Sequence, residues 1–274
     1  ASVQQIGQQA QTLAGAGRLE EALRLVESAP VSAREGLLQL RIGLLKAVER
    51  HDAVVPIRRE QAKAAPNSIA AQHNLASALG DTGANSEAEV YARKAMALGG
   101  DAPETWLVLA RSLQGQNRYG EACDAYRKVL ARRSDYVDAI NELAQALWMS
   151  GESVEQARQP YEDALSRHAG NPAILKGLAV FDEYIGLDPR EIWEGLDKRY
   201  KKTFSRSVVV ELAASHLAMK FDPALALRHA ETAVDLASQD VAAWTMLAQC
   251  LLVNARPAEA LEILPQLLQA KPYD

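Results

Sequence analysis

Histidines are the first residues to test for metal or acid–base chemistry in this sequence. The chain has five of them: His51, His73, His168, His216 and His229. His229-Ala230-Glu231 has the His-x-acid order found at the start of an iron facial triad. Residues i and i+2 of a helix point about 200° apart, so these two side chains are not expected to bind one ion. No histidine follows His229 to complete a triad, and we expect no metal site.

Other motifs that carry catalytic chemistry are also missing. The sequence has no glycine-rich phosphate loop, no cysteine pair at metal-ligand spacing and no Gly-x-Ser-x-Gly elbow. Cys123 and Cys250 are far apart in the chain, and we expect two buried thiols, as in a reducing compartment. We therefore expect no cofactor, no enzyme activity within this chain, and a cytoplasmic location.

Charge and hydropathy narrow the classes of partner. The 274 residues carry a formal net charge of −5, which disfavours a general nucleic-acid binder because phosphate neutralisation needs a basic surface. No apolar run approaches the roughly 18 residues of a membrane span, and no basic-then-apolar signal peptide opens the chain. We expect a protein or peptide partner, with no nucleic acid and no membrane.

Amphipathic helices are the elements that must position any binding residues. Between Pro103 and Ser134, apolar residues are spaced i, i+3, i+4 and i+7 along one face of an expected helix. A turn follows, and a second apolar stripe begins after it. The first stripe is Trp106, Leu109, Ala110 and Leu113, and the second is Ala122, Tyr126 and Val129. This stretch predicts a helix, a tight turn and a second helix.

The same pattern recurs along the chain. Ala76, Ala110 and Ala144 occupy equivalent positions at intervals of 34 residues, and Ala88 and Ala122 repeat in the second helix. A period of 34 residues with a large residue, a Leu-Ala pair and a turn between two helices resembles the tetratricopeptide repeat (TPR).

The resemblance implies an all-α fold, a right-handed α-solenoid of about eight helix-turn-helix units in a single domain over 1–274. We expect units near 3–30, 34–67, 69–102, 103–136, 137–170, 171–206, 207–240 and 241–274. Pro56 is expected near the start of the second helix of its unit, and Pro160 inside another, where it should bend the helix. Asp188-Pro189 predicts a strong helix start, and Pro265 makes the end of the last helix uncertain.

In TPR arrays, the first helix of each unit lines a concave groove that binds peptides. Carried over by register, this implies the groove residues His73, Asn74, Ser77, Arg111, Gln114, Asn141, Glu142, Gln145 and Lys176, with Glu104 and Asp138 beside them. Such hydrogen-bonding side chains suit the backbone of an extended peptide. The alternative is that they are ordinary solvated positions of amphipathic helices. Because Arg111 and Lys176 are two units apart, we do not expect the carboxylate clamp of some family members.

A second candidate surface is basic and aromatic. Its residues are Lys198, Arg199, Lys201, Lys202 and Arg206, interleaved with Trp193, Tyr200 and Phe204. Trp193, Leu196 and Tyr200 are spaced i, i+3 and i+7, which favours a core stripe with a solvated basic back over a binding site.

Two functional classes stay open. The first is an interaction scaffold that captures a peptide or a partner helix, with its two ends available for pairing into a homodimer. The second is a non-catalytic, substrate- or partner-positioning arm of a larger enzyme whose catalytic domain follows residue 274. The closing Lys271-Pro272-Tyr273-Asp274 resembles the junction in bacterial proteins where a TPR arm precedes an iron/2-oxoglutarate oxygenase domain. No polar capping helix follows the last unit, so we expect the native chain to continue.

Overall fold

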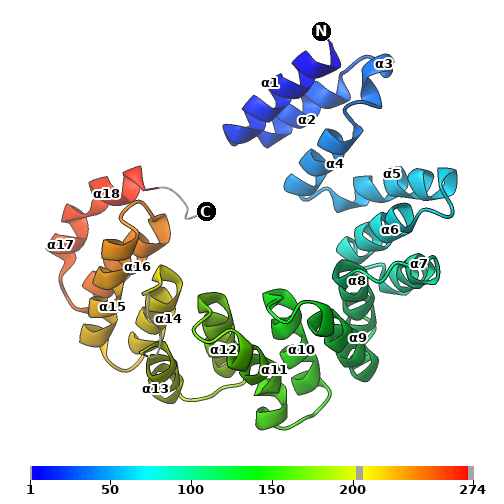
Figure 1. The fold of residues 1–274 in the computed structure, drawn as a ribbon. Coiled ribbons are helices and arrows are strands. Elements are labelled where there is room, and N and C mark those ends of the chain that lie inside the picture. The colour runs from blue at the N-terminus through cyan, green and yellow to red at the C-terminus, as the bar shows by residue number, and fades with distance from the viewer. Residues whose placement is uncertain (1, 202–205, 271–274) are drawn as a thin grey trace. The chain divides into compact units, whose positions relative to one another are not determined.

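A computed structural model describes residues 2–201 and 206–270, and every regular element within them is an α-helix (Figure 1). The helices stack as antiparallel pairs, which confirms the expected all-α repeat architecture. The chain divides into two compact units, unit 1 over Ala1–Ala125 and unit 2 over Tyr126–Asp274. Helix α9 (Tyr119–Arg132) crosses the boundary, and each unit is described by itself.

Unit 1 pairs its helices in chain order. They are α1 (Val3–Gly15), α2 (Leu19–Glu27), α3 (Val31–Arg34), α4 (Leu38–Ala47), α5 (His51–Ala64), α6 (Ile69–Asp81), α7 (Asn85–Ala97) and α8 (Pro103–Gln114). The short helix α3 was not expected from the sequence. Pro56 lies in the interior of α5, because that helix already begins at His51. Its missing N–H therefore deprives the Asp52 carbonyl of an internal hydrogen bond.

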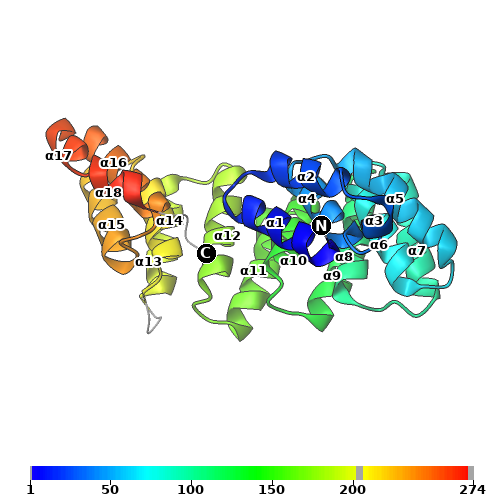
Figure 2. The same cartoon turned by 90° about the horizontal axis from the view of Figure 1, so that it is seen from above.

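Unit 2 continues the pairing in two layers. Its helices are α10 (Val137–Met149), α11 (Val154–Arg167), α12 (Pro172–Tyr184), α13 (Pro189–Tyr200), α14 (Val208–Ala218), α15 (Pro223–Leu236), α16 (Val241–Val253), α17 (Pro257–Glu262) and α18 (Leu264–Gln269). Helices α10, α12, α14 and α16, the A helices of this unit, form one layer, and α11, α13 and α15 form the other (Figures 1 and 2).

Local sequence explains where several of these helices begin. Asp188 accepts hydrogen bonds from the backbone N–H groups of Arg190 and Glu191, and Pro189 occupies the first turn, as predicted. Ser153 and Gln156 form a reciprocal capping box at the start of α11. Pro160 lies inside α11 as expected, and the helix continues past it to Arg167.

The last predicted helix is broken in two. Helix α17 ends at Glu262 and α18 begins at Leu264, with Pro265 in its first turn. Because Pro265 has no N–H to donate to the Leu261 carbonyl and its ring crowds that carbonyl, one continuous helix is unfavourable here. The residues Lys271 to Asp274, which suggested a domain junction, lie outside the described residues.

Alanines form the contacts between paired helices. Ala76, Ala110 and Ala144 are completely buried, and so are Ala88 and Ala122 in the partner helices. A methyl side chain lets two helix backbones approach closely, so larger residues pack on either side of these points. The repeated alanines of the central part of the chain are thus buried, as expected of residues at a contact between helices.

Candidate functional site

The A helices of unit 2 enclose a groove with a volume of about 630 Å³. We call it the A-helix groove. Helix α10 contributes Val137, Asn141 and Gln145, which are spaced i, i+4 and i+8 and so share one face of the helix. Helix α12 contributes a parallel row, and Val209 of α14 closes the far side. The groove therefore crosses successive A helices.

A buried tyrosine fixes the floor of the A-helix groove. The Tyr161 hydroxyl, from α11, donates a hydrogen bond of 2.9 Å to Asn141 Oδ1. Tyr161 is 1% exposed, its ring lies 5.7 Å from that of Phe181, and burial raises the pKa of its phenol well above the usual value. The hydroxyl thus remains a donor at neutral pH. With Oδ1 engaged, the Asn141 Nδ2 group has no acceptor among the described residues and is available to a ligand.

Gly177 makes room for this pair. A Cβ atom at position 177 would lie 2.5 Å from Asn141 Oδ1 and 3.1 Å from Tyr161 Cε1. Both distances are shorter than ordinary van der Waals contact, so any side chain here would displace Asn141. The glycine therefore lets α12 pack directly against the Asn141–Tyr161 hydrogen bond.

Lys176 supplies the positive charge of the groove. Its side chain is exposed and makes no ion pair with any carboxylate in the described part of the chain. The nearby Glu183 carboxylate is already held by the Lys220 ammonium group and lies 3.4 Å from His216 Nε2. These partners lower the pKa of Glu183 and keep it ionised. An incoming anion therefore meets an unpaired ammonium group at Lys176.

A second hollow of about 250 Å³ continues the groove toward α16. Lys176, Val180 and Val209 line both hollows and form the wall between them. The second hollow adds mainly apolar surface, with Leu212 from α14 and Met246 from α16. Two apolar hollows thus lie on either side of the same lysine.

The structure brings together three of the nine predicted groove residues. Asn141, Gln145 and Lys176 line the A-helix groove, whereas Glu142 of α10 is not among its lining residues. The other five, His73, Asn74, Ser77, Arg111 and Gln114, lie on α6 and α8 of unit 1.

His73, one of the predicted groove residues, packs against the neighbouring helix α8 in unit 1. Its Nδ1 atom lies 3.2 Å from Thr105 Oγ1 of α8, and burial lowers the pKa of the imidazole. A neutral ring held against the neighbouring helix is a packing contact in unit 1. Of the other four, Arg111 is exposed, and Asn74, Ser77 and Gln114 are half-buried.

The apolar lining of the groove was missed from the sequence. Val180 is 54% exposed and Tyr184 57% exposed, although both are large and apolar. Lys176, Val180 and Tyr184 are spaced i, i+4 and i+8, which is a second stripe on α12 away from the buried Leu178. This spacing is visible in the sequence, but only hydrogen-bonding residues were expected to line the groove.

The basic and aromatic stretch near α13 is mostly accounted for by packing. The Trp193 ring packs edge-on against Phe221 with centroids 6.1 Å apart, and Leu196 is buried. Arg199 is paired with Glu162 at 2.7 Å, and Lys201 with Asp197 at 2.6 Å. This arrangement agrees with the core interpretation. Lys202 and Phe204 lie outside the described residues.

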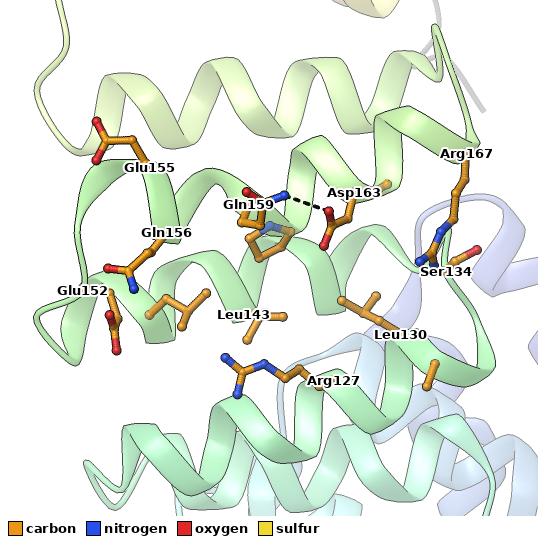
Figure 3. A pocket seen from close by; sticks show the side chains of 14 residues that line it. Arg127, Leu130, Ser134, Leu143, Glu152, Glu155, Gln156, Gln159, Asp163 and Arg167 are labelled. Atoms are coloured by element: carbon orange, nitrogen blue, oxygen red, sulfur yellow. Dashed lines mark hydrogen bonds between the residues drawn. The ribbon is translucent and has the colours of Figure 1, made fainter.

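A further pocket of about 560 Å³ lies between α9 and α11 in unit 2 (Figure 3). Leucines from α9 and α10 form its apolar part, and Gln159 donates a hydrogen bond of 2.8 Å to Asp163 at its edge. The edge carries charges of both signs, namely Arg127, Arg167, Glu152, Glu155 and Asp163. Such a mixture selects no particular ligand charge, and none of the predicted groove residues lies here.

Among residues 2–201 and 206–270, no group of three or more His, Cys, Asp or Glu side chains is arranged to hold a metal ion. In the same residues, no helix has the length and apolar character needed to cross a membrane.

Stacked helix pairs with a groove across their first helices define a helical-repeat protein. A family model described as tetratricopeptide repeat matches residues 107–172 and 213–274, and a second model of the same description matches residues 68–99. Together these matches cover more than half of the chain. The protein therefore belongs to the tetratricopeptide repeat proteins. Comparison with curated proteins found no matching sequence.

Solved structures agree on the fold. A tetratricopeptide repeat protein from Parabacteroides merdae is 12% identical, with a TM-score of 0.53, over 91% of this chain and 98% of that one. MamA from Desulfovibrio magneticus RS-1, residues 41 to the end, is 15% identical, with a TM-score of 0.51, over 62% of this chain and 96% of that one.

A longer chain also matches. In the crystal structure of the APC/C hetero-tetramer Cut9-Hcn1, the matching chain is 16% identical, with a TM-score of 0.47, and the match covers 95% of this protein. This protein spans only 51% of that chain. None of these matches supports the expected relation to iron/2-oxoglutarate oxygenases.

Proposed function

We propose that this protein is an interaction scaffold that binds a peptide or a partner helix in the A-helix groove of unit 2. The observation that supports it is the combination, in one groove of about 630 Å³, of exposed apolar side chains with the unpaired Lys176 and the available Asn141 amide. Exposed apolar surface in a concave site favours a partner that covers it.

The polar groups of the groove suit a peptide backbone. The Asn141 Nδ2 group donates to a peptide carbonyl, while Tyr161 and Gly177 hold the amide in place without taking up that donor. Because the floor is set by packed helices, little ordering of the scaffold is needed on binding. Docking of an amphipathic helix or of a polyproline II segment into a groove is a recurring mode of peptide recognition.

The test is peptide capture by the purified chain and by a groove variant. A library of 12-residue peptides displayed on phage is selected on the wild-type protein, and selected peptides are then measured by fluorescence anisotropy. We expect the double variant Asn141→Ala with Lys176→Ala to bind them at least about tenfold more weakly, since it removes a hydrogen bond and a charge.

A matched control keeps this test specific. Glu194→Ala with Lys198→Ala also removes one polar and one basic residue, from exposed positions on α13 outside the groove, and is expected to bind as the wild type does. Equal weakening by both double variants, or the selection of no peptide at all, would remove the proposal.

We further propose that catalysis, if the native protein has any, lies in a separate domain and that this chain acts as its partner-positioning arm. The support is the sequence alone, in which no glycine-rich phosphate loop, no metal-ligand cysteine pair and no Gly-x-Ser-x-Gly elbow occurs. Intact-mass measurement of the native protein tests it. A mass near 29.8 kDa favours the freestanding scaffold, and a much larger mass favours the arm.

We also propose that the protein resides in the cytoplasm and that two copies pair. Cys123 and Cys250 are buried and form no disulfide, which supports the reducing cytoplasm. Exposed leucines on α17 and α18, including Leu261 at 66% and Leu268 at 84%, support pairing of two copies through this end. Sedimentation equilibrium of the wild type and of Leu268→Glu tests the pairing, and a monomeric wild type would contradict it.

A further inference from the structure

The two hollows of the groove are separated by a charged wall. Lys176 and Val180 of α12, with Val209 of α14, line both of them. On one side the apolar surface is completed by Val137 and Tyr184, and on the other by Leu212 and Met246. A ligand that fills both hollows must therefore pass directly over the Lys176 ammonium group.

The distance between the hollows sets the spacing of the ligand's anchors. Helix α12 packs against both α10 and α14, and packed helices lie roughly 8–10 Å apart. In the extended polyproline II conformation a chain advances about 3.1 Å per residue and completes one turn in three residues, so residues i and i+3 lie about 9 Å apart on the same side. Two apolar side chains three positions apart thus reach one hollow each.

The charge of the ligand residue between the two anchors follows from the charged groups that line the wall between the hollows. Lys176 has no carboxylate partner among the described residues, whereas the Glu183 carboxylate is held by Lys220 and faces His216. A carboxylate placed between the two anchors gains an ion pair with Lys176. A basic residue at the same place meets a like charge, and Glu183, the one carboxylate that lines the two hollows in the described part of the chain, is already paired with Lys220.

We propose that the A-helix groove recognises a segment in the extended polyproline II conformation, with two large apolar residues three positions apart and an acidic residue between them. This inference rests on the proposed peptide-binding function and adds the class of ligand. Asn141 Nδ2 donates to a backbone carbonyl of the segment near the first anchor, because Asn141 lines the first hollow and not the second. The proposed order of residues in the bound segment is therefore an apolar residue, an acidic residue, any residue and a second apolar residue.

Four synthetic peptides test the rule directly. Each is a fluorescein-labelled 12-residue peptide of serine and glycine around a central four-residue motif. The motifs are Leu-Glu-Ser-Leu, Leu-Lys-Ser-Leu, Ser-Glu-Ser-Leu and Leu-Glu-Ser-Ser. We expect the first to bind best, the lysine peptide about fivefold more weakly, and each single-leucine peptide at least about tenfold more weakly.

A charge reversal in the protein gives the second arm. Lys176→Glu is expected to reverse the preference, so that the lysine peptide binds better than the glutamate peptide. Lys198→Glu makes the same change of charge on the exposed face of α13 and should leave the preference as in the wild type. Circular dichroism melting of both variants verifies that each is folded, since both positions are exposed.

The outcomes separate this inference from the proposed function. If the glutamate and lysine peptides bind equally, or if Lys198→Glu shifts the preference as much as Lys176→Glu, the rule is wrong. If phage selection yields peptides that depend on Asn141 and Lys176 but lack the apolar-acidic pattern, the groove function stands and the rule fails. If no peptide from either source binds, both fail.

Discussion

The Tyr161 hydroxyl donates a 2.9 Å hydrogen bond to Asn141 Oδ1 and thereby joins α11 to α10 beneath the A-helix groove. The bond lies against Gly177 of α12, so three helices meet at one point. A residue of the second layer thus decides how a residue of the first layer faces a ligand.

Tyr161→Phe removes this hydrogen bond and keeps the ring that packs against Phe181. We expect a loss of about 1 kcal/mol in the free energy of unfolding, because Asn141 is half-exposed and its oxygen can bond water instead. Peptide affinity should fall as well, since the Asn141 amide loses its fixed orientation. Urea unfolding and fluorescence anisotropy measure the two effects.

Tyr184→Phe is the control for that substitution. Tyr184 is 57% exposed, and among residues 2–201 and 206–270 its hydroxyl has Met149 Sδ, at 4.0 Å, as its one hydrogen-bond partner. Its loss should change stability by less than about 0.5 kcal/mol. Equal effects of the two substitutions on stability would show that the Tyr161 bond contributes nothing of its own.

Gly177→Ala should destabilise the protein although alanine favours helices. Its Cβ atom would lie 2.5 Å from Asn141 Oδ1, which the Tyr161 bond holds in place. Gly195→Ala is the matched control, because a Cβ there meets nothing within 4 Å inside helix α13. We expect the control to gain up to about 1 kcal/mol from helix propensity. Thermal melting should show opposite changes in stability for the two variants. A Gly177→Ala variant more stable than the wild type would contradict the close packing of α12 against the Asn141–Tyr161 hydrogen bond.

Asp182 should make stability depend on pH. Burial raises the pKa of Asp182 from 3.8 to about 6, and Arg158 offsets this only in part. The Arg158 Nε and Asp182 Oδ1 atoms lie 3.0 Å apart, yet their geometry is not that of a hydrogen bond and neither atom has another partner.

The folded chain therefore holds a proton on Asp182 that the unfolded chain has released between about pH 4 and pH 6. The stability that this proton contributes is full below about pH 4 and is lost as the pH rises through about 6. Asp182→Asn removes this pH dependence. The free energy of unfolding of the variant, relative to that of the wild type, should therefore rise by up to about 3 kcal/mol between about pH 4 and pH 6. Urea midpoints at several pH values measure it. Asp163→Asn changes an exposed aspartate and should show the same pH dependence of stability as the wild type. A stability difference between the wild type and Asp182→Asn that does not change with pH would contradict the assignment of this dependence to Asp182.

His229 stabilises a buried carboxylate. Trp193 Nε1 donates to His229 Nε2 at 3.1 Å, so the ring proton lies on Nδ1 and is donated to Glu211 Oε2 at 2.7 Å. His229→Ala leaves the Glu211 carboxylate, which is 4% exposed, without this donor. Tyr200 also interacts with Glu211, so we expect a loss of about 2 kcal/mol and not complete unfolding.

His216→Ala is the control for that variant, because His216 is exposed and lies 3.4 Å from a carboxylate that Lys220 also holds. It should melt close to the wild type. A His229→Ala variant as stable as His216→Ala would show that Glu211 finds another partner.

The helices and their pairing could be predicted from the sequence. Helix stripes, caps and turns depend on residues within a few positions of one another, and the repeated alanines mark where each pair meets. For the same reason Asp188 was predicted as a helix cap from four adjacent residues. The break before Pro265 was only partly visible, because local sequence shows that a helix is disturbed and not where it resumes.

The groove was decided by tertiary structure. Asn141, Tyr161, Gly177 and Val209 come from four different helices, and no local pattern shows that they meet. The register predicts Glu142 as a groove residue, whereas the α10 residues that line the A-helix groove are Val137, Asn141 and Gln145. Whether an exposed valine such as Val180 faces open solvent or a ligand-sized hollow depends on the neighbouring helices, which only the folded chain brings together.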